Sequence, residues 1–156
     1  MAEDRDPLDM VRQRLDTSEI TATIQHFEQG THTAADAAKA VGCEIAQIAK
    51  SIVFDTNTGP LIIVASGMNR VDKRVVGNAL GLKLHSVGAG YLRDKLSLEP
   101  GGVSPLAADP RVPSILDRSL LRFDNIWLSA GTPSHLLNIG VVQLCELCRP
   151  QVMPIC

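Results

Sequence analysis

Lys50 is the residue of this 156-residue sequence whose surroundings most clearly suggest chemistry. It stands in residues 48–54, a run otherwise suited to burial, where an ammonium group costs free energy unless it is paired or faces a cavity. At the mouth of a pocket, this group could bind an anion or stabilise negative charge that develops in a reaction. The other interpretation, which the segment taken alone favours, is a lysine that protects an edge strand from aggregation.

A loop at residues 101–105 offers a second chemical group, the peptide backbone. Gly101 and Gly102 let the chain approach a ligand closely, and Pro105 stiffens the exit, so exposed amides could point at a carbonyl oxygen or an oxyanion. A tight surface turn explains the same residues equally well. His135, which follows a turn at residues 131–134, is a further candidate, although a single histidine more often has a structural role.

Metal and nucleotide sites are disfavoured by the motifs. Cys145 and Cys148 form a C-x-x-C pair and residues 26–28 form H-x-E, which together match part of the zinc deaminase signature. A tetrahedral zinc site needs about four ligands and no second metal-binding pair occurs, so we favour structural cysteines over a zinc protein. The phosphate-binding loop and H-E-x-x-H are absent, and Ser104 lacks the second glycine of a nucleophile elbow.

Composition restricts the possible partners. The five aromatic residues are too few to suggest a platform on which bases stack. Fifteen Lys and Arg against seventeen Asp and Glu give a net charge of −2, so an RNA ligand would need a local basic patch. Arg70, Lys73 and Arg74, together with Lys83, are the candidate residues for such a patch, although a solvated helix face is the simpler interpretation.

The length predicts one domain over residues 1–156, with a peripheral helix within residues 1–17 and a tail at 150–156. Thr33 is expected to cap a helix that ends at Gly42, and Asn69 to cap a second helix that ends at Gly81 and has Val71, Val75, Ala79 and Leu80 on its apolar side. Asn, Gly and Pro within residues 56–60 are expected to form a hairpin turn. Further helices are expected at residues 90–98 and 141–147, and strands at 21–27, 48–55, 61–66, 82–87, 114–117, 125–130 and 136–139. Because these elements alternate without a regular βαβ period, we expect a mixed α+β fold.

Nothing in the sequence suggests a membrane or a secretory route. No apolar run approaches the ~20 residues of a membrane span, and residues 1–7 lack the features of a signal peptide. The four cysteines show no disulfide framework. We therefore expect a cytoplasmic protein with reduced thiols and no membrane partner.

Six segments, taken in order, resemble the YbaK-type family of aminoacyl-tRNA deacylases, which is similar to the editing domain inserted in bacterial prolyl-tRNA synthetases. They are residues 37–42, 50–54, 71–74 and 100–105, a strand opened by Asp117, and residues 130–136. The resemblance extends from about residue 18 to residue 152. One departure is that the family often continues its loop with Phe-Gly, where this sequence has Leu106 and Ala107.

The resemblance implies a mixed, barrel-like sheet flanked by helices, and hydrolysis of the aminoacyl ester without metal or cofactor. Lys50 would lie near the tRNA 3′ end and the ester, and the loop of Gly101, Gly102 and Pro105 would hold the aminoacyl group through its backbone. Substrate-binding roles are implied for four residues, which are Ser51, Gly131, Thr132 and His135.

We therefore expect a trans-editing hydrolase that acts on mischarged tRNA, with prolyl-tRNA synthetase as an associated partner. The alternative is a module that binds a tRNA end or an amino-acid-like ligand without hydrolysing it. An aminoacyl ester is an activated acyl group, so positioning and oxyanion stabilisation can suffice when a water or the ribose hydroxyl attacks. The sequence leaves open which amino acid is removed, which tRNA is preferred and the oligomeric state.

Overall fold

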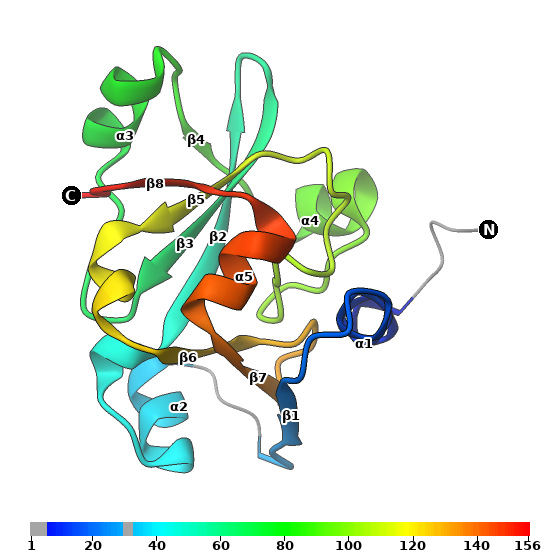
Figure 1. Cartoon of the computed structure of the whole chain (residues 1–156). Helices are drawn as coiled ribbons and strands as arrows, with labels where there is room; N and C mark the ends of the chain where they lie inside the picture. The colour runs from blue at the N-terminus through cyan, green and yellow to red at the C-terminus, as the bar shows by residue number, and fades with distance from the viewer. Residues whose placement is uncertain (1–5, 30–32) are drawn as a thin grey trace.

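Two β-sheets form the framework of the computed structural model, which describes residues 6–29 and 33–156 (Figure 1). The smaller sheet has the strand order β1 (Thr23–His26), β7 (His135–Gly140) and β6 (Asn125–Ser129). The larger sheet has the order β4 (His85–Ser86), β2 (Ala49–Thr56), β3 (Gly59–Ser66), β5 (Ser114–Asp117) and β8 (Gln151–Met153). Its β2–β3 and β2–β4 pairs are antiparallel and its β3–β5 and β5–β8 pairs parallel, so the predicted mixed α+β class is confirmed.

The sheets do not close into a barrel. An isolated bridge between Ile48 and Trp127 joins the start of β2 to β6, and the two sheets remain open among the described residues. The expectation of a barrel-like sheet was therefore wrong. A single bridge depends on one long-range contact that no local pattern of residues specifies.

The larger sheet is buried on both faces. Side chains alternate along β2 and β3, so Val53 and Val64 point into the main core, whereas Phe54 and Ile63 point to the opposite side. Helices α1 (Pro7–Thr17) and α5 (Val141–Cys148) contribute to the main core, and α3 (Lys73–Leu80) covers the opposite face. Burial on both faces explains why residues 61–65 are uninterruptedly apolar.

Local signals predicted several element ends correctly. The Thr33 hydroxyl accepts a hydrogen bond from the Asp36 amide at 3.0 Å and caps α2 (Ala34–Val41), which ends at Gly42 in the left-handed conformation. The hairpin turn expected within residues 56–60 is present, but it is shorter, because Gly59 and Pro60 already pair with β2 as part of β3. Helix α4 (Ala89–Leu96) and the short 3-10 helices η2 (Ile45–Gln47) and η3 (Arg118–Arg122) complete the fold.

Helix α3 differs from its prediction in both its cap and its buried face. Asp72, not Asn69, is the N-cap, and the Asn69 amide instead donates to the buried Asp117 carboxylate. The buried residues are Val76 and Gly77, whereas Val75, expected on the apolar side, is exposed. The prediction placed the buried face of α3 one residue away from its actual position. The segments that pack against this face, β8 and residue 155, come from the far end of the chain and leave no signal in the sequence of the helix.

The two ends of the chain are more integrated than the sequence suggested. Helix α1 lies at one side of the molecule, yet its Leu8, Val11 and Leu15 are buried in the main core (Figure 1). Residues 151–153, expected to be a tail, form β8, and the Asp72 amide donates to the Ile155 carbonyl at 2.7 Å. No helix among the described residues is long and apolar enough to span a membrane.

Candidate active site

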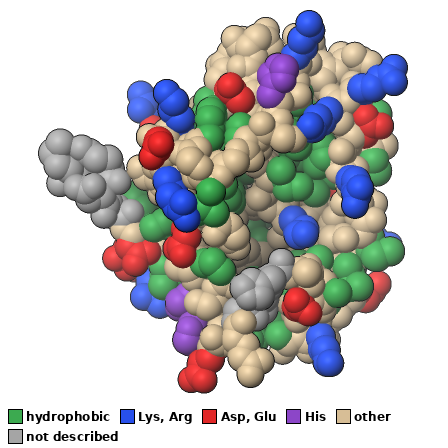
Figure 2. All heavy atoms as spheres, turned by 180° about the vertical axis from the view of Figure 1, so that it is seen from behind, with side chains coloured by type: hydrophobic (Ala, Val, Ile, Leu, Met, Phe, Trp, Pro, Cys, Tyr) green, Lys and Arg blue, Asp and Glu red, His purple; other side chains and the backbone are tan. Residues whose placement is uncertain are grey.

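A cavity of about 210 Å³ brings together several residues that the sequence singled out. It lies between the start of β2, helix α2, the loop after α4 and the turn between β6 and β7. Figure 2 shows the corresponding face of the molecule, which is hollowed near its centre. The lining residues are Thr33, Ala34, Ala37, Ile48, Ala49, Lys50, Ser51, Ile52, Gly101, Val103, Ser129, Thr132, Pro133 and Leu136. This volume is below the ~300 Å³ at which drug-sized ligand pockets begin, so the cavity suits a small group.

Lys50 lies at the exposed border of this cavity, together with Gly101 of the predicted loop. Its strand pairs with β3 on one side, but β4 reaches only Phe54 and Asp55 on the other side. The segment around Lys50 is therefore an open strand edge, whose backbone groups are available to a ligand. Within the described residues, the Lys50 ammonium has no salt bridge.

Ser51 lines the same cavity with a buried hydroxyl that lacks a partner. Its Oγ is shielded from solvent and makes no hydrogen bond within the described part of the chain. Leaving a buried hydroxyl unpaired costs about 1–3 kcal/mol, so the free protein carries an unmet donor and acceptor at this position.

The two glycines of the loop serve different purposes. Gly101 has a φ of 80°, a conformation that other residues adopt only with strain. A Cβ atom on Gly102 would lie 2.5 Å from the Thr132 backbone, so this glycine permits the loop to pack against the β6–β7 turn. The Gly102 amide donates to the Glu99 carbonyl at 2.9 Å and is already satisfied. Among the described residues, the amides of Gly101, Val103 and Ser104 make no such bond, and of these three residues Gly101 and Val103 line the cavity.

Thr132 links the cavity to His135, which does not line it. The Thr132 hydroxyl lies 2.6 Å from His135 Nδ1 and accepts a hydrogen bond from the Ser134 amide. The His135 ring lies against His26, with 4.6 Å between the ring centroids. Burial lowers the pKa of His135, and the nearby His26 and Arg12 lower it further, while Asp6 opposes them. A neutral imidazole can accept the Thr132 proton at Nδ1, so His135 orients the threonine from behind the cavity wall.

Gly131 and Pro105 also lie behind the wall. A Cβ atom on Gly131 would come within 2.7 Å of the Pro7 carbonyl carbon, which places this glycine against the start of α1. The Pro105 carbonyl accepts a hydrogen bond from Arg14 at 3.2 Å. Neither residue is among those that line the cavity.

The basic residues Arg70, Lys73 and Arg74 occupy a separate, shallow depression at the start of α3. Lys73 Nζ lies 5.9 Å from the centroid of the Phe54 ring. Phe54 and Lys50 share a face of β2 and are four residues, roughly 13 Å, apart along the strand. The basic depression and the cavity share no lining residue and are not one site.

The cysteine pair has the environment of structural residues. Burial raises the pKa of the Cys148 thiol to about 11, and it also raises the pKa of Cys145. A protonated thiol is a poor nucleophile and a poor metal ligand. Within residues 6–29 and 33–156, no three His, Cys, Asp or Glu side chains gather in a way that could hold a metal ion.

Helix α2 forms part of the cavity wall, although the sequence did not indicate that its residues belong to the site. Ala34 and Ala37 line it, and their small side chains leave space that larger apolar residues would fill. Ser129 and Leu136 were also missed, although they flank the turn that carries Thr132. Alanine at buried helix positions was the available signal for the first pair.

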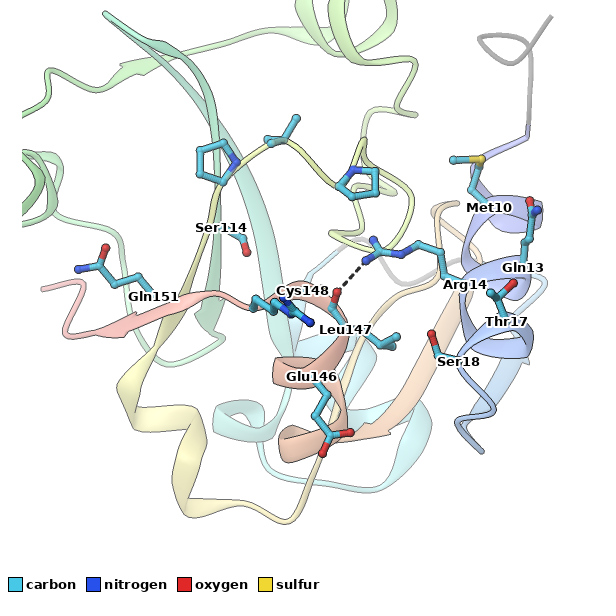
Figure 3. A pocket seen from close by; sticks show the side chains of 14 residues that line it. Met10, Gln13, Arg14, Thr17, Ser18, Ser114, Glu146, Leu147, Cys148 and Gln151 are labelled. Carbon is cyan, nitrogen blue, oxygen red and sulfur yellow. Dashed lines mark hydrogen bonds between the residues drawn. The ribbon is translucent and has the colours of Figure 1, made fainter.

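A larger groove of about 810 Å³ lies elsewhere, between α1, residues 110–114 and the end of α5 (Figure 3). None of the site residues predicted from the sequence lines it. Its rim does include Arg14, whose side chain reaches from α1 toward the last turn of α5. The smaller cavity is therefore the candidate active site.

Comparisons with known proteins identify the family that the chain is similar to. The model of a family described as "Aminoacyl-tRNA editing domain" matches residues 28–147. The chain is 30% identical over 126 residues to the uncharacterized protein YwhH of Bacillus subtilis (strain 168), and the matched region covers 79% of each chain.

Two solved structures extend the likeness to the whole fold. One belongs to a protein proposed as a trans-editing enzyme for prolyl tRNA synthetase, with a TM-score of 0.89, 30% identity and 97% of each chain covered. The other, hypothetical protein APE2540, has a TM-score of 0.86 at 22% identity, with 94% of this chain and 98% of that chain covered, and supports the fold alone.

Proposed function

The chain belongs to the aminoacyl-tRNA editing domain family, and on that basis we propose that it is a trans-editing hydrolase. Its substrate would be the ester that joins a wrongly attached amino acid to the 3′ end of a tRNA. The observation that carries this proposal is the juxtaposition of the Lys50 ammonium with the unpaired Gly101 and Val103 amides around one small cavity.

The proposed reaction is hydrolysis through a tetrahedral intermediate. A water adds to the ester carbonyl carbon and the carbonyl oxygen becomes an oxyanion. The proton that the water loses passes to the departing ribose oxygen, directly or through the adjacent ribose hydroxyl. The amides of Gly101 and Val103 would donate to that oxyanion, and Lys50 would stabilise its charge or anchor the tRNA end. The bond to the ribose oxygen then breaks, which releases the amino acid and a tRNA with a free 3′ terminus.

The cavity favours a small amino acid. Its volume of about 210 Å³ and its walls of alanine, valine and proline leave room for a short side chain. Ser51 Oγ and Thr132 Oγ1 would provide polar contacts to the aminoacyl group, with His135 holding Thr132 in place. One methylene changes binding by only ~1–3 kcal/mol, so the preferred amino acid must be measured.

The rest of the acceptor end would extend along the face of β2 toward α3. Arg70, Lys73 and Arg74 would contact its phosphates there. The triple alanine variant should then weaken tRNA binding and reduce its salt dependence, since each lost phosphate contact on a single strand lowers the slope by about 0.7. An unchanged slope would remove these residues from the interface.

A second candidate function is binding without hydrolysis. The described residues that line the cavity include no carboxylate, histidine or cysteine, so no side chain there is an evident general base. Ser104, on the same loop, is fully buried and accepts a hydrogen bond from the Leu106 amide. A module that captures an aminoacyl end for a synthetase would need no such base.

A deacylation screen distinguishes the two functions. The protein is incubated with tRNAs charged with alanine, serine, threonine and cysteine, and release of the amino acid is followed with and without prolyl-tRNA synthetase. Rapid release from one or two of these substrates, against the spontaneous rate, supports the hydrolase. Intact ester on every substrate, together with measurable binding, supports the binding module.

A further inference from the structure

We infer that Arg14 of α1 is a positioning residue for the cavity, because it ties the loop at residues 101–105 to the end of α5. The kinetic part of this inference rests on the proposed function. Helix α1 precedes residues 28–147, which carry the family match, and the sequence had suggested only a peripheral helix.

The Arg14 guanidinium makes two hydrogen bonds to distant parts of the chain. Nη1 donates to the Pro105 carbonyl at 3.2 Å, and Nη2 donates to the Leu147 carbonyl at 2.8 Å. The second bond is drawn in Figure 3. Leu147 is in the last turn of α5, where carbonyl groups have no partner within the helix. Charge-assisted bonds from a rigid, planar donor fix both acceptors in direction as well as in distance.

The loop has few other polar ties to the rest of the molecule. The Gly102 amide donates to the Glu99 carbonyl, and the Leu106 and Ala107 amides donate to Ser104. These bonds, like the others within residues 98–109 that the structure describes, stay close along the chain. The bond from Arg14 to Pro105 spans 91 positions of sequence and holds the loop to a different element.

The other end of α1 supports the opposite wall of the cavity. The start of the helix packs so closely on Gly131 that an added Cβ atom would lie 2.7 Å from the Pro7 carbonyl carbon. Gly131 precedes Thr132, which in turn contacts Gly102 of the loop. The helix therefore touches both the loop and the turn, over the roughly 10 Å that separate Pro7 from Arg14 along its axis.

The helix is a firm support because three of its side chains are in the main core. Leu8, Val11 and Leu15 are each less than 10% exposed and belong to the main hydrophobic core. Loss of the Arg14 bonds should thus leave the helix in place while releasing Pro105. The Gly101 and Val103 amides, two to four residues before Pro105, would then be held less accurately.

The experiment compares Arg14→Met with Arg12→Met. Methionine keeps much of the apolar stem but donates no hydrogen bond. Arg12 is an exposed arginine of the same helix, so its replacement removes the same charge. Rates are measured at about pH 8, above the lowered pKa of His135, because Arg12 influences that group. Hydrogen exchange of residues 98–109 is followed in parallel.

Arg14→Met should lower kcat/KM by about 10- to 100-fold, mainly through kcat, because small displacements of aligned groups are costly. Exchange should speed up in residues 98–109 and not in the β2–β3 hairpin. Arg12→Met should change neither quantity. Equal kcat/KM in the two variants, or equal exchange in the loop, would overturn the inference.

Two further outcomes remain decisive. If Arg14→Met does not fold, Arg14→Lys replaces it, since a single ammonium keeps the charge but not the two fixed donor directions. Wild-type kcat and exchange in that variant would also overturn the inference. If the wild-type protein hydrolyses none of the charged tRNAs, the proposed function fails, and the exchange comparison alone decides the role of Arg14.

Discussion

Replacing Lys50 by alanine tests the charge at the border of the cavity. Lys50 is the charged side chain among the described residues that line it. Since its side chain is exposed and makes no ion pair there, its loss should change the free energy of unfolding by no more than about 0.5 kcal/mol. Any large loss of activity can then be assigned to the site.

The size of the effect can be bounded by Coulomb's law. An ammonium about 4 Å from a developing oxyanion stabilises it by about 1 kcal/mol in bulk water and by about 4 kcal/mol at an effective dielectric constant near 20. One decade of rate corresponds to about 1.36 kcal/mol, so these limits are about 5-fold and about 900-fold. Because Lys50 is exposed on one side and faces the cavity on the other, we expect about 100-fold in kcat/KM.

The assay is release of amino acid from the charged tRNA that the screen identifies as the best substrate. Lys95→Ala, which removes an exposed lysine of α4 outside the cavity, is the matched control. Lys50→Arg keeps the charge on a longer and broader group and should retain part of the activity. Thermal unfolding of all three variants verifies that the fold is unchanged.

A Lys50→Ala enzyme within twofold of wild type would refute the electrostatic role. The same result would return this lysine to the interpretation of a residue that only protects a strand edge. A loss of activity that Lys95→Ala shares would point instead to a general weakening of tRNA binding.

Three other predictions concern the cavity wall and the residues behind it. Ser51→Ala removes the unpaired buried hydroxyl, so it should raise the free energy of unfolding by about 1–3 kcal/mol while lowering kcat/KM. The free energy of unfolding is measured by urea titration, and a destabilised variant would contradict this prediction. Gly102→Ala places a methyl group 2.5 Å from the Thr132 backbone and should cost about 1–3 kcal/mol of stability, so an unchanged denaturation midpoint would show that the loop and the turn are not tightly packed. The lowered pKa of His135 means that the unfolded chain binds a proton first, near pH 6.5, so stability should fall as the pH drops below about 7 until the folded-state pKa is reached. His135→Gln should flatten that part of the stability profile, and an equal slope in both proteins would argue against the lowered value.

Features specified by neighbouring residues could be predicted from the sequence. Thr33 and Gly42 define the ends of α2 because a hydroxyl cap and a left-handed glycine act within one turn. The hairpin after β2 follows from the residues of its own turn. Lys50 could be singled out because an ammonium in an apolar run is unusual wherever the strand lies.

Features that depend on distant segments could not be predicted. The buried face of α3 is set by residues from the C-terminal end of the chain, and nothing in residues 71–80 reports on them. The unpaired state of Ser51 Oγ follows from the packing around the cavity, not from residue types. His135 was a candidate for direct contact, and only the spatial arrangement shows that Thr132 stands between it and the cavity.

The position of β8 at the edge of the larger sheet has a consequence for folding during synthesis. Met153 and Ile155 cover the same side of the sheet as Phe54 and Ile63, and Ile155 also receives the amide at the start of α3. In a nascent chain that still lacks these residues, part of the apolar surface of the β2–β3 hairpin is exposed to water. Folding of this half must therefore wait until residues 151–155 leave the ribosome, and variants truncated before β8 should aggregate rather than accumulate as a smaller soluble domain.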